Sequence, residues 1–121
     1  MDDILDARIL LNIFAVAYSP NDHDWRPLRA GVDISLLYGG GPDEPAAALL
    51  RYAAGAQIPL HEHRGYEHIL ILSGSQRDEH GEYGTGSFLI NPPGSQHSVI
   101  SPGGCLVLAI WHKPVHFPHG V

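Results

Sequence analysis

A chain of 121 residues has room for one ordinary domain, and its net charge of −6, with only seven Lys and Arg, leaves no basic stripe for a nucleic acid. The longest apolar run, at 9–18, is interrupted by Asn12 and is too short to cross a bilayer, and acidic residues precede it where a secretory signal would be basic. We therefore expect a single cytoplasmic domain over 1–121, with no nucleic-acid or membrane partner.

Turn-forming residues divide the chain into short segments. With 14 Gly and 10 Pro, long helices have little room. A strand is predicted in the N-terminal segment 1–30, at 7–18, although the Ala and Leu content there would also suit a helix. Regular spacing then predicts strands at 31–38, 48–54, 67–74, 86–91 and 104–111. This pattern is typical of an all-β sandwich or barrel.

The single cysteine, Cys105, has no partner for an intrachain disulfide. It lies in the apolar run CLVLAIW, where a buried thiol is ordinarily a packing residue. No serine elbow of the G-x-S-x-G type is present either. The sequence therefore offers no recognisable nucleophile and base pair, and catalytic residues stay unassigned.

Three histidines and two glutamates crowd into HEHRGYEH, at 61–68. In an extended segment His61 and His63 point to the same face, because strand side chains alternate. Gly65 can turn the chain back, so that Glu67 opens the next strand beside the two histidines. Two imidazoles and a carboxylate are thus expected to converge.

A fourth donor comes from GSFLINPPGSQH, which places His97 just past a tight Pro-Gly turn. The four residues would then lie on two separate hairpins. Histidine and carboxylate donors that meet in this way are typical of a metal site. The predicted metal ligands are His61, His63, Glu67 and His97.

The two motifs read G-x5-H-x-H-x3-E-x6-G, from Gly55 to Gly74, and G-x5-P-x-G-x2-H, from Gly86 to His97. Both resemble the signature motifs of the cupin superfamily. The resemblance implies a small cupin β-barrel of the jelly-roll type, a double-stranded β-helix, with the four predicted ligands as the family's metal ligands. Cupins often have Asn where this chain has Ser101, at a structural position.

A narrower resemblance runs from Leu49 to about Leu108, within a motif core at 49–111, and is carried by DEHGEY, NPPGS and GGC. This stretch is similar to the cupin domain of the ChrR-like proteins. In the ChrR family the anti-sigma activity belongs to a separate N-terminal helical zinc-binding domain, and this chain has no Cys/His cluster for one. The resemblance therefore implies the fold and the metal site rather than transcriptional regulation.

Three imidazoles and one carboxylate suit a divalent transition metal, and the lack of thiolates and of several carboxylates argues against copper(I), calcium and magnesium. We expect zinc first, with Fe, Mn or Ni as alternatives. Four ligands would close a tetrahedral zinc site, whereas a six-coordinate metal would keep two open positions. The first hypothesis is thus a ChrR-like module that binds or senses a metal or a small ligand. The alternative is a metal-dependent dioxygenase that uses the same site.

The other histidines are expected outside this site: His23, His68, His80, His112, His116 and His119. His68 must face outward if Glu67 faces the barrel interior. The tail WHKPVHFPHG is expected to be solvated rather than a second metal site. Four residues are near enough in sequence to line a pocket for a small molecule, although packing or exposure is their ordinary role: Arg51, Tyr52, Gln57 and Tyr66.

The strand EHILILSG carries apolar side chains on both faces. A second layer must cover the face opposite Glu67, because an exposed sheet would leave that face in water. We expect a homodimer, with the apolar segment from Ile9 to Ala17 as the candidate joining element.

Overall fold

Short antiparallel strands make up most of the computed structural model, which describes residues 7–17 and 23–120. A short 3-10 helix, η2 (Ile13–Ala17), precedes the strands. The strands are β1 (Arg26–Arg29), β2 (Val32–Tyr38), β3 (Ala46–Tyr52), β4 (Gln57–Glu62), β5 (Glu67–Asp78), β6 (Gly81–Gly84), β7 (Phe88–Asn91), β8 (Gln96–Ile100) and β9 (Cys105–Trp111). Within the described residues, no helix has the length and apolar character needed to cross a bilayer.

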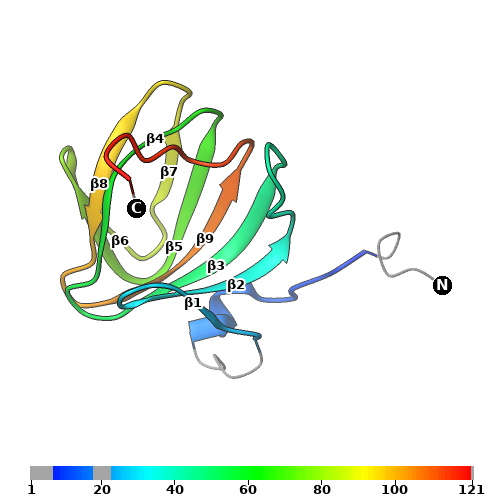
Figure 1. Cartoon of the computed structure of the whole chain (residues 1–121). Coiled ribbons are helices and arrows are strands. Elements are labelled where there is room, and N and C mark those ends of the chain that lie inside the picture. The colour runs from blue at the N-terminus through cyan, green and yellow to red at the C-terminus, as the bar shows by residue number, and fades with distance from the viewer. Residues whose placement is uncertain (1–6, 18–22, 121) are drawn as a thin grey trace.

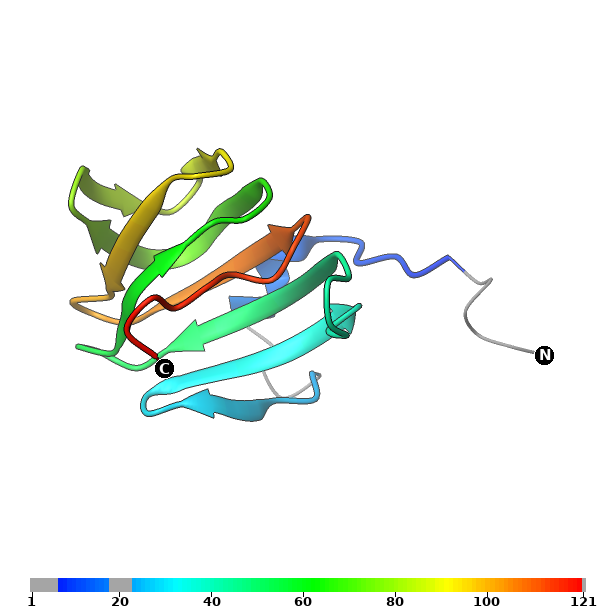
Figure 2. The ribbon, with the colours of Figure 1, turned by 45° about the horizontal axis from the view of Figure 1, so that its top comes forward.

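The sheet is curled into an open half-barrel (Figure 1). Its strand order is β1-β2-β3-β9-β5-β8-β4, and β6 and β7 pair with β5 off this path. Every named pairing is antiparallel. The edge strands β1 and β4 therefore lie on opposite sides of the opening, and the C-terminal segment runs through the space between them (Figures 1 and 2).

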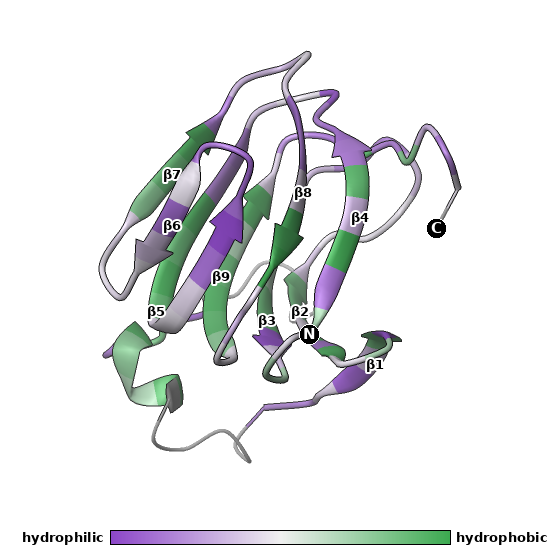
Figure 3. Cartoon of the chain, turned by 90° about the vertical axis from the view of Figure 1, so that its left-hand side faces the viewer, coloured by the Kyte–Doolittle hydropathy of each residue, from purple (hydrophilic) through white to green (hydrophobic). Residues whose placement is uncertain are grey.

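The two faces of the central strands pack into two apolar clusters. Inside the half-barrel, Ile69, Ile71 and Val107 belong to a buried cluster formed by alternate residues of several strands. On the outer face, Val16 of η2 packs with Leu72 and other side chains of β3, β5 and β9. The short helix η2, whose residues are apolar, lies beside one end of β5 (Figure 3). Part of the outer face is thus covered by the same chain.

The five strands predicted between 31 and 111 correspond to β2, β3, β5, β7 and β9, and the all-β class is confirmed. Cys105 is buried in β9, as expected. The strand predicted at 7–18 is wrong for the described residues, which contain η2 instead, while residue 18 lies outside them. Ile13 and Val16 both contact the outer cluster. A spacing of three suits a helical turn, which directs both side chains to one side.

Two glycines allow β5 and the β8–β9 turn to come into close contact. Gly74 has φ 75° and Gly104 has φ 87°, both in the left-handed region that favours glycine. A Cβ atom added to Gly74 would lie 2.1 Å from the carbonyl oxygen of Gly104. This approach seats β9 against β5, which carries the predicted carboxylate ligand at its first residue.

Candidate metal centre

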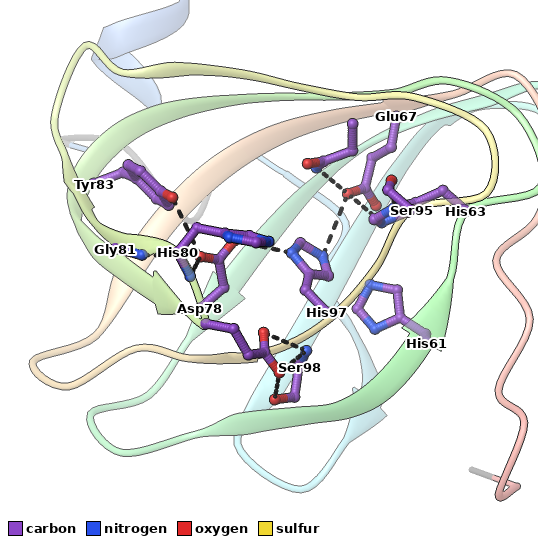
Figure 4. A network of polar contacts seen from close by, with 12 residues as sticks. His61, His63, Glu67, Asp78, His80, Gly81, Tyr83, Ser95, His97 and Ser98 are labelled. Atoms are coloured by element: carbon purple, nitrogen blue, oxygen red, sulfur yellow. Dashed lines mark hydrogen bonds and ion pairs between the residues drawn. The ribbon is translucent and has the colours of Figure 1, made fainter.

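The structure brings the four predicted ligands together inside the half-barrel. Glu67 opens β5 directly after the turn at Gly65, and His61 of β4 is the register partner of His97 in β8. His63 follows β4. All four side chains are buried, and one donor atom from each lies within 4.8 Å of the other three (Figure 4).

Hydrogen bonds at the outer ring nitrogens set the tautomers of His61 and His63. Nδ1 of His61 lies 2.9 Å from the carbonyl oxygen of Pro59, which can only accept, so this nitrogen carries the proton. Nδ1 of His63 lies 2.8 Å from Oγ of Ser95, whose hydroxyl donates to the carbonyl oxygen of Pro92 at 2.6 Å. Ser95 therefore accepts from His63. Both rings keep a free lone pair on Nε2.

A carboxylate fixes the third ring. Nδ1 of His97 lies 3.1 Å from Oδ2 of Asp78, so this nitrogen donates and Nε2 keeps its lone pair. Oδ1 of Asp78 accepts from the backbone N–H groups of His80 and Gly81, at 2.8 and 3.2 Å, and from the Tyr83 hydroxyl. Burial raises the pKa of Asp78, but these donors and His97 hold it below its usual value. The ring of His97 is thus held by an ionised carboxylate.

The Glu67 carboxylate is held at both oxygens. Oε1 accepts from Nδ2 of Asn91 at 3.0 Å, and Oε2 accepts from Nε1 of Trp111 at 2.6 Å. Burial raises the pKa of Glu67, but the hydrogen bond and positive charge that His63 and His97 offer when they are protonated, together with the Trp111 N–H, outweigh burial and keep that pKa below its usual value. The carboxylate is therefore ionised at neutral pH.

Burial shifts the pKa of a histidine in the opposite direction, because histidine is charged when it is protonated. Burial lowers the pKa of His61 and so favours the neutral imidazole. The centre thus combines a neutral imidazole with an ionised carboxylate, which are the protonation states that bind a metal.

The donor set fits a transition-metal ion. Nε2 of His63 lies 3.0 Å and Nε2 of His97 lies 3.8 Å from Oε1 of Glu67. Both nitrogens are buried without a hydrogen-bond partner among the described residues. A buried polar atom without a partner is costly, and a bound cation would give both nitrogens one. Three imidazoles with one carboxylate are a common donor set for such an ion.

The remaining described histidines do not join this cluster. His68 is on the outer side of β5, where its ring lies near those of Tyr66, Phe88 and His112, with centroids 5.6–6.1 Å away. This agrees with the predicted alternation after Glu67. In the part of the chain that the structure describes, no second group of metal-ligating side chains forms around the C-terminal histidines.

A mostly apolar pocket of about 590 Å³ adjoins the centre and is bordered by His61, Glu67 and His97. Of the four residues considered for such a pocket, Tyr52 lines it, whereas Arg51, Gln57 and Tyr66 do not. Arg51 is paired with Asp33 at 2.8 Å and lies over the ring of Trp25, which explains its different position.

The C-terminal segment closes one side of this pocket. Glu62 and His116 exchange two backbone hydrogen bonds, of 2.7 and 2.9 Å, and the Phe117 ring centroid lies 5.6 Å from that of His61. The expectation of a solvated tail holds for the exposed residues Pro114 and His116, but it is wrong for Val115 and Phe117, which are half-buried and line the pocket. The sequence carries no pattern for this contact, because it depends on a single bridge to β4.

Sequence reasoning also missed the side chains that orient the ligands. Asn91 and Trp111 are both register partners of Glu67, so a correct strand register would have identified them. Asp78 lies 19 residues before His97, at the end of the long strand β5, and no spacing rule singles it out. Its role follows only from the folded geometry.

A curled antiparallel sheet of this kind, with three histidines and a glutamate gathered in its interior, defines a cupin. The chain belongs to the family of the ChrR cupin-like domain, whose model matches residues 15–116.

Two of the relatives are anti-sigma factors named ChrR. The anti-sigma-E factor ChrR of Cereibacter sphaeroides is 37% identical over 98 residues, which cover 79% of this chain and 45% of that protein. The solved complex of Rhodobacter sphaeroides SigE with the anti-sigma factor ChrR matches with a TM-score of 0.67 and 34% identity, over 79% of this chain and 54% of that chain. This chain thus spans about half the length of the relatives it matches.

A more distant structure shares the fold. The acetylacetone dioxygenase of Acinetobacter johnsonii matches with a TM-score of 0.72 and 18% identity, over 92% of this chain and 78% of that one.

Proposed function

We propose that this chain is a metal-binding cupin module that holds one divalent transition metal through His61, His63, Glu67 and His97 and binds a small molecule in the adjoining pocket. The observation that carries the proposal is the convergence of the four donor atoms within 4.8 Å. Two of the nitrogens among them have no other partner. The four ligands satisfy zinc in tetrahedral geometry, and zinc is our first choice.

The residues around the ligands would keep the site in one geometry. A bound metal would supply Lewis acidity toward an oxygen of a small molecule. Asp78 and Ser95 orient two imidazoles, while Asn91 and Trp111 hold both oxygens of Glu67. Such outer contacts affect metal affinity in proteins by about 10–100-fold. The module would therefore be preorganised for its ion.

A metal-dependent dioxygenase is the second candidate. It is favoured by the pocket, which reaches three of the four ligands and would allow a small molecule to approach the metal. The named activity of the Acinetobacter johnsonii structure is compatible with this candidate. Iron(II) loading under air, followed by oxygen-uptake measurements with β-diketones, separates the two. Turnover of about 1 per second or more would favour the enzyme, and inactivity with tightly held zinc would favour the binding module.

We also propose a homodimer, because two apolar surfaces lie uncovered. Ile9 and Leu11 are 76% and 96% exposed, and Phe88 and Ile90 on β7 are 56% and 59% exposed. Contact between copies would remove these side chains from water. Light scattering of the protein at micromolar concentration should give the mass of a dimer, and the double variant Ile9→Ser, Leu11→Ser should give less dimer. A monomeric wild-type protein would contradict the proposal.

Metal analysis of protein purified without added metal tests the site directly. We expect about one ion per chain in the wild type and a strong loss in His61→Ala and His97→Ala, because three ligands would remain. His68→Ala and His119→Ala should keep the ion, since both positions lie outside the predicted ligand set. Full occupancy in both ligand variants would show that the assignment is wrong.

A further inference from the structure

The pocket contains a positive charge that forms no ion pair with a side chain of the described chain. Arg29, on the edge strand β1, lines the pocket, and its Nε is buried without a hydrogen-bond partner. Among the described residues, no carboxylate forms an ion pair with it. A buried guanidinium nitrogen without an acceptor is costly, so a ligand oxygen at this place would be stabilising.

Phe117 connects this charge to the metal centre. Cζ of Arg29 lies 5.0 Å from the Phe117 ring centroid, and the same ring lies 5.6 Å from the His61 ring. Arg29 belongs to β1 and His61 to β4, the two edges of the open half-barrel. Phe117 therefore lies between the two edges, on the C-terminal segment that crosses the opening (Figure 2). One ligand could contact both ends of the pocket.

The walls between these ends are mostly apolar. Ile34, Leu50, Ile69 and Val99 line the pocket, whose volume of about 590 Å³ falls in the range of small-molecule sites. Two further charged groups border it: Glu67, which is held by its own donors, and Glu44, which is exposed on the β2–β3 connection. Apolar walls with a guanidinium whose Nε lacks an acceptor would select a molecule with a hydrocarbon body and an anionic end.

We propose that the pocket binds a small apolar carboxylic acid, with its carboxylate on Arg29 and its apolar body directed toward the metal centre. A guanidinium matches a carboxylate because two parallel N–H donors meet two oxygens. The matching amide and alcohol would lose this charge-assisted pairing. The inference rests on the proposed function, because it names the class of small molecule that the pocket would bind. Arg29 and the apolar walls carry it, whereas the predicted metal ligands only border the pocket.

Calorimetric binding of octanoate and 3-phenylpropionate, each compared with its amide, tests the proposal in the full chain. The wild type should bind each acid about 10–100-fold more tightly than its amide, as expected for a hydrogen-bonded charge pair. Arg29→Gln should abolish that preference and Arg29→Lys should restore part of it. Arg26→Gln provides the matched control, since Arg26 lies on the same strand but is exposed and paired with Asp24. It should behave as the wild type.

Three results would overturn the proposal: no binding of either acid, an acid preference that persists in Arg29→Gln, or an equal loss of acid and amide in that variant. An acid preference that persists in Arg29→Gln would place the carboxylate at the metal. An equal loss of acid and amide binding would mean that Arg29 only maintains the shape of the pocket. Each titration is made with metal-loaded and metal-free protein, and metal content is measured separately. Arg29-dependent binding without bound metal would support this inference even if the proposed metal site failed.

Discussion

Oδ2 of Asp78 lies 3.1 Å from Nδ1 of His97, and this contact decides which nitrogen of His97 faces the other donors. A carboxylate accepts, so Nδ1 must carry the proton and Nε2 is left to bind an ion. Nothing else in the centre can substitute for this contact, because the three remaining predicted ligands contact His97 from the other side of its ring (Figure 4).

Asp78→Asn should therefore weaken metal binding by about 10–100-fold. The new amide can donate to Nδ1 of His97, which would move the ring proton to Nε2 and remove the lone pair. Competition with a chromophoric chelator measures the affinity. Glu82→Gln is the control, since this exposed carboxylate pairs with Arg77 rather than with a predicted ligand. Equal affinities in wild type and Asp78→Asn would contradict the assigned tautomer.

Trp111→Phe should also weaken metal binding, by about tenfold, because Glu67 loses the 2.6 Å hydrogen bond to Oε2. The change keeps an aromatic ring at the end of β9. It should also raise the pKa of Glu67, since the indole N–H stabilises the ionised form. Metal retention measured from pH 7 downward should fail at a higher pH in this variant. Identical retention curves would refute the role of Trp111.

Protonation of His61 should make the metal-free protein sensitive to mild acid. Burial lowers the pKa of His61 in the folded chain, whereas the unfolded value is about 6.5. Below that pH the unfolded state binds more protons, so the stability contributed by the neutral ring is fully present above about 6.5 and is lost as pH falls. Urea unfolding between pH 8 and pH 5 should show a larger loss in wild type than in His61→Gln. Parallel pH profiles would contradict the lowered pKa.

Gly74→Ala should destabilise the fold by more than about 2 kcal/mol, because it adds a strained left-handed residue and a clash with the Gly104 carbonyl oxygen. Gly103→Ala is the matched comparison. An added Cβ there meets nothing within 4 Å, and its φ is not positive, so a change within about 0.5 kcal/mol is expected. Chemical denaturation of both variants measures the difference. A Gly74→Ala protein as stable as wild type would show that β5 and the turn do not meet so closely.

The predicted ligands and most strands could be identified from the spacing of residues within short segments of the sequence. His61 and His63 were placed on one side by strand alternation, and the same rule placed His68 outside. The N-terminal segment was assigned wrongly because nearly all of its residues are apolar, so the spacing of three between Ile13 and Val16 does not stand out in the sequence. Local apolar content could not distinguish a strand from a single helical turn.

Contacts between segments that lie far apart in the chain could not be predicted from the sequence. Arg29 and Phe117 are far apart in the chain and meet only because the sheet curls and leaves an opening. Asp78 reaches His97 because β5 and β8, although separated in the chain, are neighbouring strands of the sheet. Such pairs have no common motif, so their chemistry becomes visible only when the register of the sheet is known.

Strand β9 follows every other described strand in the chain, yet it stands between β3 and β5 in the middle of the sheet. During synthesis from the N-terminus, β3 and β5 must therefore wait with hydrogen-bonding edges exposed until β9 has emerged. The pairings that join them span large sequence separations, which slows folding. The nascent chain is accordingly most prone to edge-to-edge aggregation after β5 has emerged and before β9 has followed it.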